Sequence, residues 1–149
     1  MPIDPVFGLL RCGGVYARVA LICGLSVGPA AAVLAQELDC EAAMTQSEMN
    51  ACAAQEFALA DADLNEAYAA ARRALRAVDA DLPSDLRGGE VALRDAQRAW
   101  ITFRDKACAA EGFQMRGGSA EPLLVYGCKA RLTDQRAEAL WDLAAGFDG

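Results

Sequence analysis

Apolar and polar residues follow two different patterns along the chain, and the change falls near residue 36. Residues 19–35 carry no charge and are rich in apolar and small side chains, and Arg11 and Arg18 precede them. The stretch ends in Val33-Leu34-Ala35, the small-x-small pattern that signal peptidase cleaves. This order predicts a secretory signal peptide over residues 1–35, cleaved after Ala35, and a mature domain over residues 36–149.

Two alternatives to cleavage are less consistent with the sequence. A retained membrane anchor needs about 20 apolar residues, and Gly28-Pro29 interrupts a run that is shorter than this. A lipoprotein needs a small residue before its lipidated cysteine, but Cys23 follows Ile22 and Cys40 follows Asp39. We therefore expect a periplasmic or secreted protein that has no stable membrane anchor once the signal is removed.

The mature part shows the periodicity of helices. Thr45-Gln46-Ser47-Glu48 has the sequence of a capping box, in which the Thr and Glu side chains each accept from a backbone amide at the helix start. Apolar or small residues then recur at steps of three and four: Met49, Ala53, Phe57, Ala60, Leu64, Tyr68, Ala71, Leu75 and Val78. Leu82-Pro83 and Gly88-Gly89 break this stripe, so the first helix is expected to end near Asp79.

Two further stripes follow. The second consists of Leu93, Ala96, Trp100, Phe103 and Ala107, and it fades at Glu111-Gly112. After a flexible connection at Gly117-Gly118, Ser119 is a suitable N-cap, and Pro122 is tolerated at the third helical position. The last stripe consists of Val125, Cys128, Leu132, Leu140 and Leu143, and Gly127 and Thr133 leave open whether it is one helix or two. The predicted fold class is all-α, a compact antiparallel bundle of three to four helices.

Removal of the signal changes the charge and the cysteine count. The whole chain has a formal charge of −7 and six cysteines. Without residues 1–35 the charge is −8, and four cysteines remain: Cys40, Cys52, Cys108 and Cys128. An even number in an exported protein predicts disulfides, here two, with three possible pairings. We favour Cys40–Cys52 and Cys108–Cys128, because each would close one local loop and staple a helix end.

Charge and composition exclude several classes of function. An acidic chain without a basic block lacks the Lys and Arg contacts on which nucleic-acid binding depends. The sequence has no histidine, which removes Ser–His and Cys–His couples and histidine-ligated zinc. It also has no phosphate-binding glycine loop and no nucleophile elbow. The carboxylates that could in principle serve acid–base chemistry or a metal are better explained as solvated ion pairs: Asp61, Asp63, Asp95 and Asp105. We therefore expect no enzyme activity, no cofactor and no metal.

Polar residues embedded in the apolar stripes form a second group of candidates. They lie on comparable turns of the first two predicted helices: Asp61, Asn65, Tyr68, Gln97, Trp100 and Arg104. A polar group that borders a core must be hydrogen-bonded, because an unsatisfied one costs roughly 1–3 kcal/mol. We interpret the group as a structural network between helices, with Asp61 paired to Arg104, in preference to a ligand site.

Four ordered segments of the mature chain carry a combined signature. The first two are Asp39-Cys40 with Thr45-Gln46-x-Glu48-Met49-Asn50-x-Cys52, and Ala60-Asp61-x-x-Leu64-Asn65-x-x-Tyr68. The others are Ala96-Gln97-Arg98-Ala99-Trp100-x-x-Phe103-Arg104-Asp105-x-x-Cys108, and Gly118-Ser119-x-x-Pro122-x5-Cys128 continuing into Leu132-Thr133-x-x-Arg136. Together they span residues 39–140 and contain all four cysteines. The combination resembles the LprI-type lysozyme-inhibitor family.

The resemblance implies a small exported helical domain of the bacterial envelope that binds lysozyme and inhibits it stoichiometrically. It supplies no catalytic or inhibitory residues that could be carried over to this chain. Lysozymes are typically strongly basic, so an acidic domain would be steered toward them. The alternative is a periplasmic interaction or adaptor domain that has another protein partner and no effect on lysozyme.

The connection over residues 112–122 is the candidate partner-binding element. A Cys108–Cys128 disulfide would hold its base, and loops on a rigid scaffold often carry function. Met115, Arg116 and Ser119 lie on this connection and are our candidate contact residues. The alternative is an ordinary link between two helices.

Overall fold

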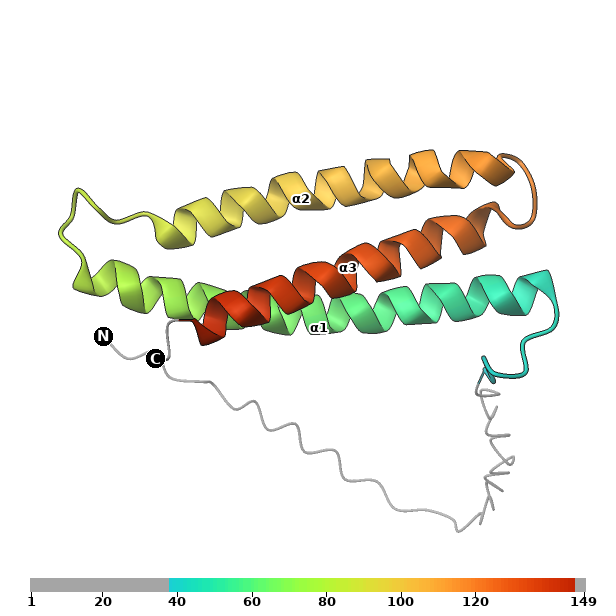
Figure 1. Ribbon diagram of the computed structural model, residues 1–149, viewed down its shortest axis with the longest axis horizontal. Coiled ribbons are helices and arrows are strands. Elements are labelled where there is room, and N and C mark those ends of the chain that lie inside the picture. Colours follow the sequence, from blue (N-terminus) through green and yellow to red (C-terminus); the bar gives the residue numbers. More distant parts are fainter. Residues whose placement is uncertain (1–37, 147–149) are drawn as a thin grey trace, which may run out of the picture. The chain divides into compact units, whose positions relative to one another are not determined.

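The computed structural model describes residues 38–146, which form three long helices (Figure 1). Helix α1 spans Gln46–Asp81, α2 spans Gly89–Gly112 and α3 spans Glu121–Ala145, and a 3-10 turn, η1, covers Phe113–Met115. Figure 1 shows α2 antiparallel to both α1 and α3, and the described range contains no strand. The predicted all-α antiparallel bundle is confirmed, with three helices. The predicted signal peptide and its cleavage site lie outside the described residues.

Helix α1 begins at the predicted capping box. The Glu48 amide donates to Thr45 Oγ1 over 3.2 Å, and the Thr45 amide donates to Glu48 Oε2 over 2.9 Å. These bonds lower the pKa of the Glu48 carboxyl, with the Thr45 amide as the main cause. Every position of the predicted first stripe is buried or half-buried. The helix has 36 residues and ends at Asp81, two residues later than expected, shortly before Pro83.

A single carboxylate near the end of α1 caps the start of α2. Asp79 Oδ1 accepts from the amides of Gly88 and Gly89 over 2.9 Å each, and Asp79 Oδ2 accepts from the Glu90 amide over 3.1 Å. The first amides of a helix have no partner within it, so Asp79 supplies the cap that Gly88 lacks. These three amides lower the pKa of the Asp79 carboxyl, with the Gly88 amide as the main cause. Gly88 has φ of 140°, a conformation that favours glycine.

The apolar core draws on all three helices. Its buried members are Leu64, Ala67, Ala71, Leu93, Ala137 and Leu140. Three of these are alanines with no exposed surface: Ala67, Ala71 and Ala137. Small side chains let two helix backbones approach closely, so α1 and α3 pack against each other over most of the length of α3. Trp100 of α2 is half-buried and packs against this cluster.

The stripe predicted for α2 is wrong at two positions. Phe103 is 60% exposed and Ala96 is also exposed, whereas Gln97 and Arg104 are only 6% and 7% exposed. The prediction placed Ala96 and Phe103 on the buried face and Gln97 and Arg104 at its border. In the structure Gln97 and Arg104 occupy the buried face, and both polar side chains are hydrogen-bonded there, with Gln97 accepting from Arg136 Nε over 3.0 Å.

Helix α3 is one continuous helix, which answers the question left open by Gly127 and Thr133. Its N-cap is Ala120, so the expectation that Ser119 caps it is wrong, and Pro122 occupies the second helical position instead of the third. Ser119 does not cap the helix because it lies within a turn, in which the Glu121 amide donates to the Gly118 carbonyl over 3.2 Å. The helix therefore begins one residue later than a Ser119 cap would require.

The two disulfides are Cys40–Cys52 and Cys108–Cys128, so the favoured pairing is confirmed. Their Cα–Cα distances are 5.6 Å and 5.4 Å, within the range usual for disulfides. The first closes the segment before α1 onto that helix. The second joins the last turns of α2 to the first turns of α3, which confirms the expectation that each disulfide staples a helix end.

Candidate functional site

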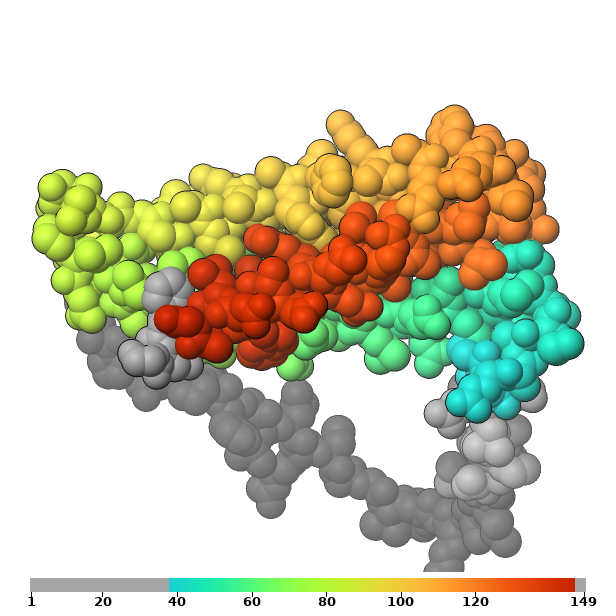
Figure 2. Space-filling view, viewed as in Figure 1, coloured from blue at the N-terminus to red at the C-terminus, as the bar shows by residue number. Residues whose placement is uncertain are grey.

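Both disulfides lie at the same end of the bundle, which we call the disulfide end and define as residues 38–52 and 108–128. The chain enters α1 here, and α2 is connected to α3 here. Figure 2 shows the segment before α1 in cyan and the connection after α2 in orange at this end. Asn50 links the two parts, because its Nδ2 donates to the Ser119 carbonyl over 2.9 Å. Two disulfides and a hydrogen bond therefore fix the disulfide end. At the opposite end, the hydrogen bonds of Asp79 fix the start of α2 to the end of α1.

The connection between α2 and α3 is short and internally bonded. The Arg116 amide donates to the Phe113 carbonyl over 3.3 Å, and the Gly118 amide donates to the Met115 carbonyl over 2.9 Å. Gly117 has φ of 75°, in the left-handed region that glycine adopts without strain. Such a loop has a defined backbone shape before any partner arrives, and preorganisation of this kind lowers the entropic cost of binding.

Glu121, the first residue of α3, binds two residues of this loop through its carboxylate. Its Oε2 accepts from the Gly117 amide over 2.8 Å, and its Oε1 forms an ion pair of 2.6 Å with Arg116 Nη1. The Gly117 amide, followed by Arg116, lowers the pKa of the Glu121 carboxyl. The loop therefore depends on an ionised Glu121 to keep its shape.

The loop exposes apolar side chains at its surface. Phe113 is 63% exposed and Met115 is 51% exposed, and the Arg116 guanidinium lies 4.8 Å from the centroid of the Phe113 ring. Met44, directly before α1 at the same end, is 87% exposed. Large exposed apolar side chains beside a charged group are typical of protein interfaces.

Of the three predicted contact residues, Met115 and Arg116 project from the loop next to Phe113. Ser119 is exposed, but its backbone carbonyl is already occupied by Asn50. Sequence reasoning missed Phe113. Its signal was an aromatic residue placed directly after Glu111-Gly112, where the predicted stripe fades and no core remains to bury the ring.

Arg104 stands at the centre of the expected polar network. Its Nη1 lies 3.0 Å from Asp61 Oδ1 and 3.3 Å from Thr133 Oγ1, and its Nε lies 3.1 Å from Asp105 Oδ1. The guanidinium also lies 5.2 Å from the ring centroid of Trp100. One buried cation thus joins all three helices, which is the structural role expected from the sequence.

Tyr68 and Gln97 do not belong to this cluster, whereas Asn65 borders it. Asn65 Nδ2 donates to the Asp61 backbone carbonyl over 2.7 Å and to Asp61 Oδ2 over 3.4 Å, and the residue remains exposed. Tyr68 is half-buried beneath Arg72, whose guanidinium lies 5.6 Å from its ring centroid. Gln97 pairs separately with Arg136, and burial lowers the pKa of the Arg136 guanidinium. The single predicted network is therefore divided: Asp61, Asn65, Trp100 and Arg104 form one cluster, Gln97 belongs to a separate interhelix link, and Tyr68 makes a local contact.

The carboxylates considered for acid–base or metal chemistry occupy different surroundings. Asp61 and Asp105 both form ion pairs with Arg104. Asp63 accepts from Trp141 Nε1 over 3.0 Å, and Asp95 lies near Arg94 and Arg98 of its own helix. Within residues 38–146, no group of three or more acidic or cysteine side chains is arranged to hold a metal ion.

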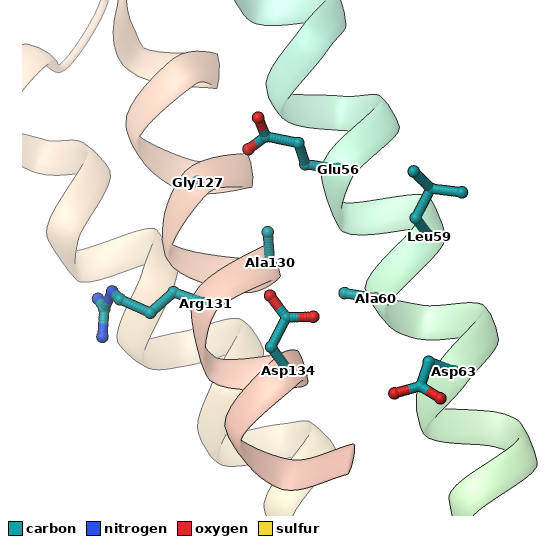
Figure 3. A pocket seen from close by; sticks show the side chains of 8 residues that line it. All are labelled: Glu56, Leu59, Ala60, Asp63, Gly127, Ala130, Arg131 and Asp134. Carbon is teal, nitrogen blue, oxygen red and sulfur yellow. The ribbon is translucent and has the colours of Figure 1, made fainter. Parts of the chain in front are cut away.

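A shallow groove lies between α1 and α3, apart from the loop (Figure 3). Its lining consists of Glu56, Leu59, Ala60, Asp63, Gly127, Ala130, Arg131 and Asp134. Sequence reasoning did not single out this groove, because its residues come from two helices that are far apart in the sequence.

Comparison with known proteins identifies the family. The family model described as "Lysozyme inhibitor LprI" matches residues 39–140, so the chain belongs to this family. The chain is 44% identical over 110 residues to an uncharacterized protein of Rhizobium meliloti strain 1021, covering 72% of this chain and 79% of that protein. A crystal structure of a DUF1311 family protein from Pseudomonas putida KT2440, which is the same family, aligns with a TM-score of 0.58 at 27% identity. That alignment covers 68% of this chain and 95% of the other.

None of the three described helices combines the length and the apolar character that a membrane-spanning helix needs.

Proposed function

We propose that this protein is an exported inhibitor of lysozyme, which it binds stoichiometrically through the loop of the disulfide end. The observation that carries the proposal is the family match over residues 39–140, which covers both disulfides and all three helices. The exposed side chains of Phe113 and Met115 support the choice of surface, because they are apolar, close in the chain and held on a braced loop. Binding would rely on the shape of the protein, and no catalytic group is required.

Electrostatics favours an encounter with lysozyme. The chain without residues 1–35 has a formal charge of −8, and lysozymes are typically strongly basic. Opposite net charges raise the association rate at low ionic strength and lose this effect as salt increases. Arg116 is held by Glu121, so the loop itself is nearly neutral, and its apolar side chains provide contact area.

The proposal includes export to the periplasm or the medium. Residues 1–35 have the order of a signal peptide, and both disulfides of the described domain require an oxidising compartment to persist. Cleavage after Ala35 would leave the domain that begins at Gln36. Mass spectrometry of the protein recovered after export would detect this N-terminus.

The test is a peptidoglycan-clearing assay in which the purified, oxidised protein is titrated into lysozymes of several types at low and moderate salt. We expect clearing to slow in proportion to the protein added, with a weaker effect at the higher salt. The triple variant Phe113→Ala, Met115→Ala, Arg116→Ala is the loop control and should lose most of the inhibition. If micromolar protein slows none of the lysozymes, the inhibitor function is wrong, and an interaction domain with another partner becomes the better explanation.

A further inference from the structure

The groove between α1 and α3 has the shape and chemistry to receive a long side chain from a partner. It has a volume of about 490 Å³, and its floor is made of small residues: Ala60, Gly127 and Ala130. A Cβ placed on Gly127 would meet no atom within 4 Å, so the space above this residue is open. No residue of α2 lines the groove.

The rim of the groove is acidic and poorly neutralised. Glu56, Asp63 and Asp134 line it, and none of the three takes part in an ion pair between described residues. The one cation of the lining, Arg131, forms a 3.1 Å ion pair with Glu111 of α2. Figure 3 shows Arg131 pointing away from the carboxylates, while the side chains of Glu56 and Asp134 are directed into the space between the helices. The groove therefore presents net negative charge.

Apolar side chains border the same groove. Leu59 is part of its lining and is 66% exposed. Trp141 is 40% exposed and donates its Nε1 hydrogen to Asp63 Oδ1 over 3.0 Å, which holds the indole beside the groove. Carboxylates next to an exposed aromatic ring suit an arginine or lysine side chain, whose stem packs on apolar surface while its charged end meets the acids.

We propose that this groove binds an arginine or lysine side chain of lysozyme, as a second contact beside the loop. This inference rests on the proposed function, since it takes the partner from there. A second copy of the chain is a poor occupant, because a two-fold contact would set the same carboxylates against each other. A small ligand is also a poor occupant, because the groove is open and offers no buried polar group to orient it.

The experiment measures the affinity of the purified, oxidised protein for lysozyme at low and moderate salt, with the clearing assay run on the same samples. The charge variant is Glu56→Gln with Asp134→Asn, which keeps the size of both side chains. The matched control is Asp85→Asn with Asp95→Asn, which removes the same charge from exposed positions outside the groove lining. A third variant, Gly127→Leu, fills the groove without changing any charge. Circular dichroism verifies that each variant folds.

We expect the charge variant and Gly127→Leu each to weaken binding about tenfold, while the matched control changes it by less than about twofold. If both groove variants bind like the wild type while the wild type inhibits, the groove proposal is overturned and the inhibitor function stands. If the charge variant alone weakens binding, the carboxylates act by long-range attraction, and groove occupancy is again overturned. If the wild type neither binds nor slows lysozyme, the proposed function fails, and the groove proposal fails with it.

Discussion

Arg104 Nη1 lies 3.0 Å from Asp61 Oδ1, and this ion pair joins the middle of α2 to the middle of α1. The Arg104 side chain is only 8% exposed, whereas that of Asp61 is 42% exposed. The cation therefore sits inside the bundle while its anion reaches solvent. Rings from two helices flank the guanidinium, with centroids 5.0 Å away for Phe57 and 5.2 Å away for Trp100. The ion pair and the two aromatic rings together explain how the bundle accommodates the charge of Arg104 in its interior.

Replacement of Arg104 by alanine should destabilise the fold. The variant loses a buried hydrogen bond to Thr133, the ion pairs and the packing of the arginine stem, so we expect a loss of about 2 kcal/mol in the free energy of unfolding. Arg98→Ala is the control, because Arg98 is 73% exposed and lies 3.9 Å from Asp95, and it should change stability by less than about 0.5 kcal/mol. Urea unfolding of both variants tests this. Equal effects would show that the buried position of Arg104 does not matter.

Acid should destabilise the protein through its capping carboxylates. The pKa of Asp79 is lowered by the amides of Gly88, Glu90 and Gly89, so ionised Asp79 favours the folded state. This contribution is fully present above the unfolded-state pKa of about 4, and it is lost as the pH falls through the lower folded-state pKa. Asp79→Asn should lower the thermal midpoint at pH 7 and flatten its decline below pH 4. A decline as steep as that of the wild type would contradict the assigned role.

Two glycines should respond in opposite directions to alanine. A Cβ at Gly112 would lie 2.5 Å from Val125 Cγ2, so Gly112→Ala should destabilise the protein by about 1–3 kcal/mol despite the better helix propensity of alanine. A Cβ at Gly127 meets nothing within 4 Å, so Gly127→Ala in α3 should stabilise by about 0.5–1 kcal/mol. Thermal unfolding of the two variants provides the comparison. The same sign for both would refute the close approach at Gly112.

Removal of the second disulfide should affect both stability and binding. Cys108–Cys128 closes a loop with a sequence separation of 20, for which the chain-entropy relation gives about 3 kcal/mol. The double variant Cys108→Ser, Cys128→Ser should therefore unfold at lower urea concentration and inhibit lysozyme less well. The corresponding variant of Cys40 and Cys52 should lose comparable stability but retain more inhibition, because that disulfide does not hold the loop. If the variant of Cys108 and Cys128 inhibited lysozyme as well as the wild type, the loop would not be the inhibitory surface.

Helices and disulfides of this protein could be predicted from the sequence because their signals are local. The capping box at Thr45 and Glu48 and the stripe of α1 depend only on residues close in the chain, and both were confirmed. The stripe of α2 was misjudged at Ala96 and Phe103, because steps of three and four fit that apolar pair as well as they fit Gln97 and Arg104, which are the residues the structure buries. The pairing of Arg104 with Asp61 was expected, but the bond from Arg104 to Thr133 and the bond from Arg136 to Gln97 join different helices, and the local pattern does not connect these residues.

The candidate site shows the same limit. Met115 and Arg116 could be placed on a loop from the spacing of the cysteines and glycines. The exposure of Phe113 and the capping of α2 by Asp79 depend on how the ends of neighbouring helices meet. The α1–α3 groove combines residues about 70 positions apart, such as Glu56 and Gly127. Such features appear only when the helices are packed.

The central proposal is that the protein inhibits lysozyme stoichiometrically through the loop of the disulfide end, and an inhibitor of this kind would compete with substrate for the cleft of lysozyme. The most direct measurement is a calorimetric titration of lysozyme with the purified, oxidised protein, with and without a saturating chitooligosaccharide, a fragment of the lysozyme substrate. The account predicts one protein bound per lysozyme and a marked loss of apparent affinity when the saccharide fills the cleft. Absence of binding, or binding that the saccharide leaves unchanged, would contradict it.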